Sequence, residues 1–217
     1  MTDLRRRRVW AVVPLVAAAL VAPLAGPMLT ADAATDVTFV AASHSDPASQ
    51  KFKQAVIPAT AQAGDTAVMV FTRATSVSWT GPSGVTGWAQ VDSFAGNSLT
   101  STVYRKALTA GDVGSTVRFD TANFAKGLLT VSVYRGVDPG SPFVISHASD
   151  ATSTTSHTTP TVAGVFGQAV MSYWVDRSDT TTAWSTPAPA VTRDTVIGTG
   201  TGRYSGLSVD SGGTVAT

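Results

Sequence analysis

Short runs of apolar and β-branched residues, separated by Gly, Pro, Asp and Ser, make up the chain after about residue 35. In the run Leu128–Tyr134, every second residue is apolar (Leu129, Val131, Val133), which is the period of a β-strand with one face in a core. Thr66–Phe71 is apolar on both sides, as a central strand covered on both faces would be.

The pattern predicts twelve strands, and no stretch after the N-terminal segment has the 3.6-residue period of an amphipathic helix. The predicted strands are Val37–Ala42, Phe52–Ile57, Thr66–Thr72, Ser76–Trp79, Ala89–Phe94, Leu99–Lys106, Thr116–Asp120, Gly127–Tyr134, Phe143–Ala148, Ala169–Tyr173, Val191–Val196 and Tyr204–Val209. Short strands at such spacing are typical of an all-β sandwich or barrel. We therefore expect an antiparallel β-sandwich, jelly-roll-like, with one apolar layer between two sheets.

Two local features refine this picture. Ala63-Gly64-Asp65 and Ala110-Gly111-Asp112 each precede a predicted strand, and we expect both Asp side chains to bond nearby backbone rather than a metal or ligand. The Ser/Thr-rich stretch Ser149–Thr161 is compatible with a linker or with an exposed edge strand. We favour the edge strand, because the residues before it would make a thin sandwich alone.

The N-terminus has the form of a secretion signal: four arginines (residues 5–8), an uncharged run (9–24) and the small-x-small site Ala31-Asp32-Ala33. The uncharged run is shorter than the roughly 20 apolar residues of a membrane-spanning helix. The sequence thus predicts a cleaved signal helix over residues 1–33, a single domain over residues 34–217, and a secreted, extracellular protein with no membrane association after cleavage.

Composition agrees with a secreted all-β domain. Four of the 15 basic and two of the 14 acidic residues lie in residues 1–33, which leaves 11 basic and 12 acidic residues and a net charge of about −1. The remaining chain has no basic run, so we expect no nucleic-acid partner. It has no Cys and therefore no disulfides, and every acid is Asp, a turn former, rather than the helix former Glu.

No catalytic constellation stands out, so the sequence predicts a protein that is not an enzyme. Asp210-Ser211-Gly212 resembles the nucleophile loop of chymotrypsin-like proteases, and His44 precedes it in the order of that class. We reject this interpretation, because His44 comes too early in the mature chain and too few residues follow Ser211. No cofactor is expected, and the candidate ligands for a Ca²⁺ ion are Asp176 and Asp179.

Four tryptophans follow the signal, and a tryptophan in a sandwich is usually part of the core. Trp184 lies in a Thr-rich stretch, and Trp88 lies at the start of a predicted strand. If any tryptophan stacks on a sugar ring, these two are the candidates, Trp184 first.

Several short motifs follow one another in an order typical of one group of proteins: Gly87-Trp88, residues 103–106, residues 134–138, residues 157–160 and residues 172–174. In this order the chain resembles uncharacterised secreted actinobacterial modules that are often found beside PKD-type (immunoglobulin-like) repeats. The resemblance implies a β fold and carries no catalytic residues. Similar modules continue past the Asp-Ser-Gly segment, so it also implies a C-terminally truncated chain with neighbouring domains as partners.

These observations favour a noncatalytic extracellular adhesion or glycan-binding module, with a polysaccharide or cell-surface glycan as partner. Two alternatives stay open. One is a structural spacer or phage-tail-like surface module. The other is an accessory part of an extracellular hydrolase, which would need carboxylates such as Asp194 and Asp210 to meet in a cleft.

Overall fold

The computed structural model describes residues 36–140, 143–152, 154–162 and 168–215. These residues contain eleven β-strands and no helix, and every strand pairing is antiparallel, which confirms the all-β antiparallel sandwich. They belong to one compact unit, Ala34–Thr217. Within them, no helix has the length and hydrophobicity to cross a membrane. The predicted signal, residues 1–33, lies outside the described residues.

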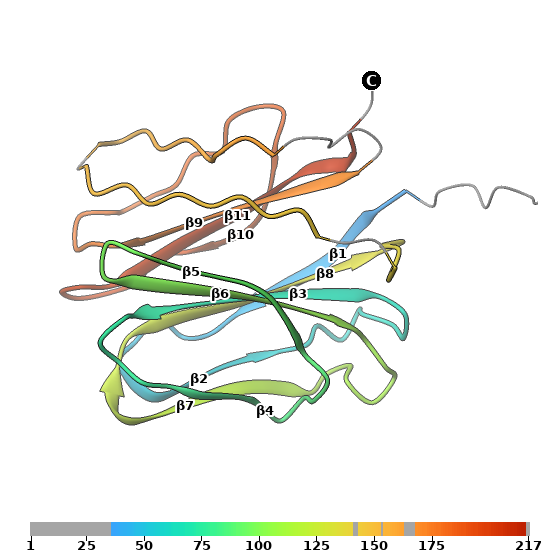
Figure 1. Ribbon diagram of the computed structural model, residues 1–217, viewed down its shortest axis with the longest axis horizontal. Coiled ribbons are helices and arrows are strands. Elements are labelled where there is room, and N and C mark those ends of the chain that lie inside the picture. Colours follow the sequence, from blue (N-terminus) through green and yellow to red (C-terminus); the bar gives the residue numbers. More distant parts are fainter. Residues whose placement is uncertain (1–35, 141–142, 153, 163–167, 216–217) are drawn as a thin grey trace, which may run out of the picture. The chain divides into compact units, whose positions relative to one another are not determined.

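The strands form three sheets, stacked as layers in Figure 1. The central sheet has the order β1-β8-β3-β6-β5, the lower sheet β2-β7-β4 and the upper sheet β10-β11-β9. The strands are β1 (Thr38–His44), β2 (Gln50–Val56), β3 (Thr66–Ala74), β4 (Thr80–Ser83), β5 (Ala89–Gly96), β6 (Leu99–Ala107), β7 (Thr116–Ala125), β8 (Gly127–Arg135), β9 (Ala169–Arg177), β10 (Val191–Val196) and β11 (Tyr204–Thr214).

The third sheet is a difference from the expected two-sheet sandwich with one apolar layer. A jelly roll has eight strands in two sheets, whereas the described residues form eleven strands in three. The first eight strands are divided between the central and lower sheets, with β5 and β6 following each other in the central sheet, and the upper sheet is built entirely from the last three strands. The central sheet is therefore covered on both faces, which explains why β8 is buried over almost its whole length.

The lower layer, between the central and lower sheets, holds the larger core. Leu129, Val131 and Val133 of β8 contribute to it, as the alternation of the sequence predicted. Phe71 of β3 stacks on Phe119 of β7, with ring centroids 4.2 Å apart. Burial of such side chains contributes about 1.5–3 kcal/mol each, so this layer carries most of the apolar stabilisation.

The upper layer is smaller and more polar. Leu128 packs with Val196 and Tyr204 of the upper sheet. Tyr173 of β9 also faces this layer, and burial raises the pKa of its hydroxyl. Gly206 lets β11 come close, because a Cβ there would lie 2.6 Å from Leu128.

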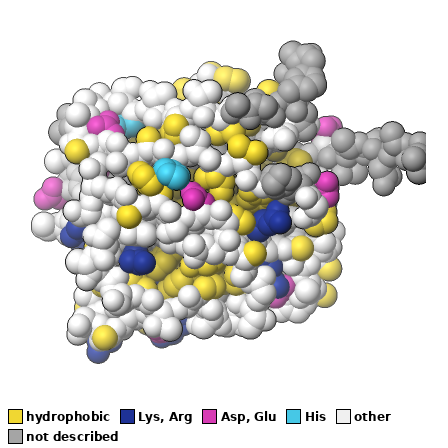
Figure 2. All heavy atoms as spheres, viewed as in Figure 1, with side chains coloured by type: hydrophobic (Ala, Val, Ile, Leu, Met, Phe, Trp, Pro, Cys, Tyr) yellow, Lys and Arg dark blue, Asp and Glu magenta, His cyan; other side chains and the backbone are white. Residues whose placement is uncertain are grey.

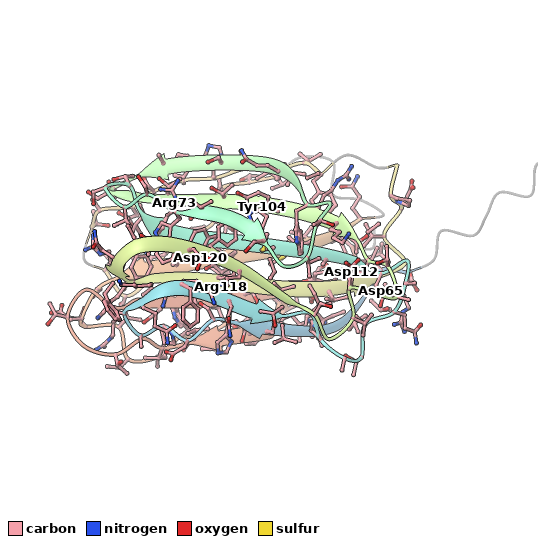
Figure 3. The ribbon with its side chains drawn as sticks, turned by 90° about the horizontal axis from the view of Figure 1, so that it is seen from below. Asp65, Arg73, Tyr104, Asp112, Arg118 and Asp120 are labelled. Atoms are coloured by element: carbon pink, nitrogen blue, oxygen red, sulfur yellow. The ribbon has the colours of Figure 1, made fainter. Side chains whose placement is uncertain are left out.

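The two Asp turns are as predicted. The backbone amide of Gln62 donates to Asp65 (2.8 Å) and that of Thr109 donates to Asp112 (2.7 Å), so each Asp bonds the residue three positions before it. The two turns are also bonded to each other, because Leu108 exchanges backbone hydrogen bonds of 2.8 Å with Gly64 and Asp65. Figure 3 shows Asp65 and Asp112 near each other at one end of the sheets.

Three predicted strands are wrong. Residues 76–79 form a turn and an irregular stretch, and the neighbouring residues Thr80–Ser83, which were not predicted as a strand, form β4. Residues 143–148 and the described part of residues 149–161 are not strands. They form the long irregular connection between β8 and β9 in Figure 1, anchored to β5 by side chains rather than by strand pairing.

Candidate functional site

The tryptophans proposed as sugar platforms are half-buried. Trp88 directly precedes β5 and packs against the lower core, and Trp184 lies in the loop between β9 and β10. The indole N–H groups of both are buried and have no hydrogen-bond partner within the described residues. Neither residue presents a fully open ring to solvent.

The most exposed large apolar side chain among the described residues is Phe124, near the end of β7. Its side chain is 72% exposed, and the ammonium of Lys51 on β2 lies 5.7 Å from its ring centroid. Sequence reasoning missed Phe124, because it concentrated on tryptophan. The residues around it, Thr121-Ala122-Asn123, carry no apolar alternation, which is the signal that could have placed Phe124 outside the core.

A second aromatic ring lies on the same strand pair, on the outward face of the lower sheet. Lys53, Ala55, Val117 and Phe119 are buried, so alternation turns Phe52, Gln54, Arg118 and Asp120 to the other face. Lys51 and Phe124 lie at the bulged end of this strand pair, where the register shifts between Gln50 and Phe52, so alternation does not place them on the face of Phe52. We use the name β2–β7 surface for the exposed and half-buried residues Lys51, Phe52, Gln54, Arg118, Asp120 and Phe124 of these two strands.

Arg118 organises the centre of the β2–β7 surface. Its guanidinium lies 4.2 Å from the ring centroid of Phe52 and donates to Asp120 from Nε (2.8 Å) and Nη2 (2.5 Å). Phe52 and Asp120 are paired across β2 and β7, which explains how one arginine reaches both. The hydrogen bond to Asp120 raises the pKa of Arg118. The Arg118 and Asp120 side chains are 40% and 46% exposed, so their outer atoms are open to a ligand (Figure 3).

Phe52 and Arg118 place a flat apolar group and a flat polar group side by side on the outward face of the lower sheet. Aromatic rings and guanidinium planes offer broad faces for a flat ligand. The amide of Gln54 and the carboxylate of Asp120 lie beside them and can exchange hydrogen bonds with hydroxyl groups. The same combination of stacking face and hydrogen-bonding edge matches a sugar ring.

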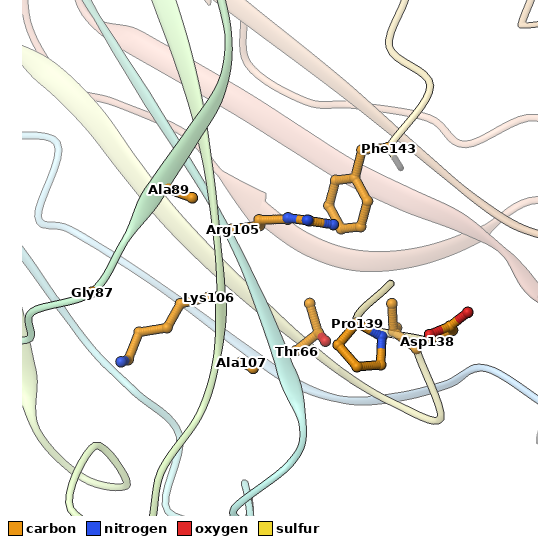
Figure 4. Close-up of a pocket in the computed structure, with 10 residues that line it drawn as sticks. Thr66, Gly87, Ala89, Arg105, Lys106, Ala107, Asp138, Pro139 and Phe143 are labelled. Atoms are coloured by element: carbon orange, nitrogen blue, oxygen red, sulfur yellow. The ribbon is translucent and has the colours of Figure 1, made fainter. Parts of the chain in front are cut away.

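A small pocket lies elsewhere, where the ends of β3, β5 and β6 meet the loop after β8 (Figure 4). Its volume is about 160 Å³, below the 300–1,000 Å³ of typical ligand sites. The guanidinium of Arg105 lies 5.3 Å from the ring centroid of Phe143. Lys106 points to the other side in Figure 4 and pairs with Asp112 at 3.2 Å. The charged groups of this pocket therefore already serve the fold.

The residues of the rejected protease motif have separate partners. His44 Nδ1 lies 3.0 Å from Asp194 on β10, whereas the Ser211 hydroxyl donates to the Gly213 carbonyl (2.5 Å) and accepts from the Val170 amide (3.1 Å). Asp210 is paired with Arg193 at 2.7 Å. The described residues therefore show no bonded Ser–His pair.

The proposed Ca²⁺ ligands follow each other at the end of β9. Asp176 accepts a hydrogen bond from the Thr181 hydroxyl, and Asp179 is exposed in the following loop. In the described part of the chain, no three His, Cys, Asp or Glu residues gather in a group that could hold a metal.

No family model, curated protein or solved structure matches this chain. The resemblance to secreted actinobacterial modules therefore stays a prediction from the sequence motifs. Most of the face in Figure 2 is covered by uncharged atoms, and some of its acidic side chains lie beside histidines. The β2–β7 surface combines aromatic, basic, acidic and amide side chains, all of them exposed or half-buried, on two neighbouring strands.

Proposed function

We propose that this protein is a noncatalytic, extracellular glycan-binding module that attaches to polysaccharide through the β2–β7 surface. The observation that carries the proposal is the exposed ring of Phe124 on the same strand as the Arg118–Asp120 pair. An exposed large aromatic side chain has no role in the core, and its ring face is available for the apolar face of a sugar. The proposed location outside the cell rests on the predicted secretion signal.

The surface supports binding of a chain rather than of a single small molecule. Phe124 lies four residues along β7 from Asp120, the residue paired with Phe52, so the two aromatic positions are separated along the strand pair. A polysaccharide can contact both at once, and several weak contacts along one chain add up. The Arg118 guanidinium packs 4.2 Å from the Phe52 ring and is itself bonded to Asp120, which restricts this ring before a ligand arrives and lowers the entropy cost of binding.

The test uses the chain from residue 34 onward on a panel of soluble and insoluble cell-wall and plant polysaccharides, with affinity electrophoresis and pull-down as readouts. We expect Phe124→Ala and Arg118→Ala each to weaken binding about tenfold or more, equal to about 1.4 kcal/mol. Trp184→Ala is the matched control, because Trp184 lies outside the β2–β7 surface, and it should bind as the unmodified protein does.

Thermal unfolding of each variant separates loss of binding from loss of folding. Normal binding by Phe124→Ala and Arg118→Ala would contradict the proposed surface. If the unmodified protein binds no glycan in the panel, the glycan-binding function is wrong and the spacer interpretation takes its place.

A further inference from the structure

The connection from β8 to β9 carries a hydroxyl-rich segment, residues 149–161, which is described except for position 153. Every described residue from Ser149 to Thr158 is exposed, and none of them pairs with a strand. Its described hydroxyl residues are Ser149, Thr152, Thr154, Thr155, Ser156, Thr158, Thr159 and Thr161. This segment is longer than most connections in compact domains, and loops of such length are commonly functional.

Side-chain contacts fix the start of the segment against β5. His147 stacks on Phe94 with ring centroids 4.1 Å apart, and its Nδ1 lies 3.2 Å from Asp92. Ser149 then packs closely on Gly96, where a Cβ would lie 2.7 Å from the serine. The segment thus leaves the sheet at a defined point and does not collapse onto the core.

Beyond this anchor the segment is held by its own polar groups. Asp150 accepts from the Thr152 amide (2.8 Å) and hydroxyl (2.5 Å), and His157 Nδ1 lies 3.2 Å from the same carboxylate. The other ring nitrogen of His157 lies 3.0 Å from the Thr154 carbonyl. All of these contacts join residues 150–157 to one another, so this part of the segment is held by local hydrogen bonds.

Within this loop several hydroxyls take no part in the fold. In the described part of the chain, the side-chain hydroxyls of Thr155, Ser156 and Thr158 make no hydrogen bond. An irregular, exposed backbone can enter the active site of a modifying enzyme, which a strand paired in a sheet cannot do. Ser- and Thr-rich stretches with proline, here Pro160, are the composition of O-glycosylated segments.

We propose that this segment is an O-glycosylation site, with Thr155, Ser156 and Thr158 as the main acceptors. A transferase would use a sugar activated through a phosphate carrier. The hydroxyl oxygen bonds to the anomeric carbon, the bond from that carbon to the carrier phosphate breaks, the phosphate leaves with the bond electrons, and a base of the transferase takes the hydroxyl proton. A neutral sugar fits this loop better than phosphate does, because a phosphate would meet the Asp150 carboxylate in the same loop. This inference is independent of the glycan-binding proposal.

The test is the mass of the full chain produced and secreted by the organism that encodes it, compared with the chain produced in the cytoplasm of a host without protein O-glycosylation. We expect a ladder of whole sugar masses on the secreted protein alone, and fragmentation should place it on residues 149–161. The double variant Thr155→Val with Thr158→Val should lose most of the ladder. Thr60→Val with Thr86→Val, two exposed threonines in other loops, should keep it.

An unmodified segment in the secreted protein would overturn the proposal. Phosphate mass increments on the segment, or equal modification of Thr60 and Thr86, would also overturn it. Folding of the variants does not limit the test, because valine replaces exposed side chains that make no bond in the fold.

Discussion

Arg135 of β8 binds Asp65 through both carboxylate oxygens, with Nε–Oδ1 at 2.8 Å and Nη2–Oδ2 at 2.9 Å. Asp65 also accepts the Gln62 amide and is almost fully buried, whereas Arg135 is 45% exposed. The pair therefore fixes the turn before β3 to the end of β8 and completes a turn that the Asp already holds locally. The pair is a bidentate, charge-assisted interaction, and such hydrogen bonds are stronger than those between neutral groups.

Asp65→Asn should lower the free energy of unfolding at neutral pH by about 2 kcal/mol, through loss of the charged hydrogen bonds. The hydrogen bond from Arg135 is the main cause that lowers the pKa of Asp65 below 3.8. Because the pKa of Asp65 is lower in the folded protein than in the unfolded chain, ionised Asp65 stabilises the fold at pH values above its unfolded-chain pKa. This stability is lost as the pH falls through the folded-state pKa. Urea unfolding between about pH 2 and pH 6 should show an acid loss in the unmodified protein that is smaller in Asp65→Asn.

Asp120→Asn is the matched control for this effect. Asp120 also binds an arginine, but its side chain is 46% exposed. Exposed pairs contribute less than about 1 kcal/mol. Equal destabilisation by the two substitutions would contradict the structural role of Asp65.

His44 should make stability depend on pH in the opposite direction. The hydrogen bond to Asp194 is the main cause that raises the pKa of His44 above 6.5. The stability that the His44–Asp194 pair contributes is fully present below the pKa of His44 in the unfolded chain. It is lost as the pH rises through the pKa of His44 in the folded protein. We expect the unmodified protein to lose more thermal stability between about pH 6 and pH 8 than His44→Gln does.

NMR titration checks the cause directly. Asp194→Asn removes the partner charge and should lower the pKa of His44. An unchanged His44 titration in Asp194→Asn would show that this pair does not link β1 of the central sheet to β10 of the upper sheet.

Lys53 is a fully buried cation in β2. Its ammonium donates to the carbonyls of Asp46 (2.7 Å) and Ala48, and burial lowers its pKa to about 8. The folded protein therefore releases this proton before the unfolded chain does, so the Lys53 contribution to stability rises with pH between about 8 and 10.5. The difference in unfolding free energy between the unmodified protein and Lys53→Met should grow over this range, by at most about 1.36 kcal/mol per pH unit. Both proteins contain the same tyrosines, so the ionisation of these tyrosines cancels in the difference. A difference in unfolding free energy that does not change with pH would contradict the lowered pKa of Lys53.

Gly198 should not tolerate a side chain. A Cβ there would lie 2.3 Å from the Tyr204 carbonyl oxygen, inside the β10–β11 connection. Gly198→Ala should destabilise by about 1–3 kcal/mol, because backbone must move to relieve the contact. Gly111→Ala is the control, since its nearest neighbour is 4.0 Å away, and it should be neutral or stabilising in thermal unfolding. Similar melting temperatures for the two variants would show that the connection can adjust.

The strand pattern could be predicted where alternation was strong. Leu129, Val131 and Val133 lie in the lower core, and the doubly apolar β3 is a central strand. The prediction failed at residues 76–83, where the strand lies four residues later than expected, and at residues 143–161. In the second case the β-compatible Thr residues have no partner strand, and strand propensity without a partner does not make a strand.

The candidate surface was less predictable than the fold. Trp88 and Trp184 were the candidates for stacking on a sugar ring because of their large aromatic side chains, but their indole N–H groups are buried. Phe124 was overlooked, because it lies beyond the predicted strand Thr116–Asp120 and only tryptophans were considered as stacking rings. The pairing of Phe52 with Asp120, and so the reach of Arg118 to both, depends on the register of β2 with β7, which no local pattern shows.

Local chemistry was enough for the strand class, most strand positions and the two Asp turns, because period-two alternation and i to i−3 capping act within a few residues. The number of sheets and the second buried layer above Leu128 depended on long-range packing. Alternation separates the two sides of a strand but does not say whether each side meets another sheet or water. That choice is made by contacts between residues far apart in the chain, such as those that bring β9, β10 and β11 onto the central sheet.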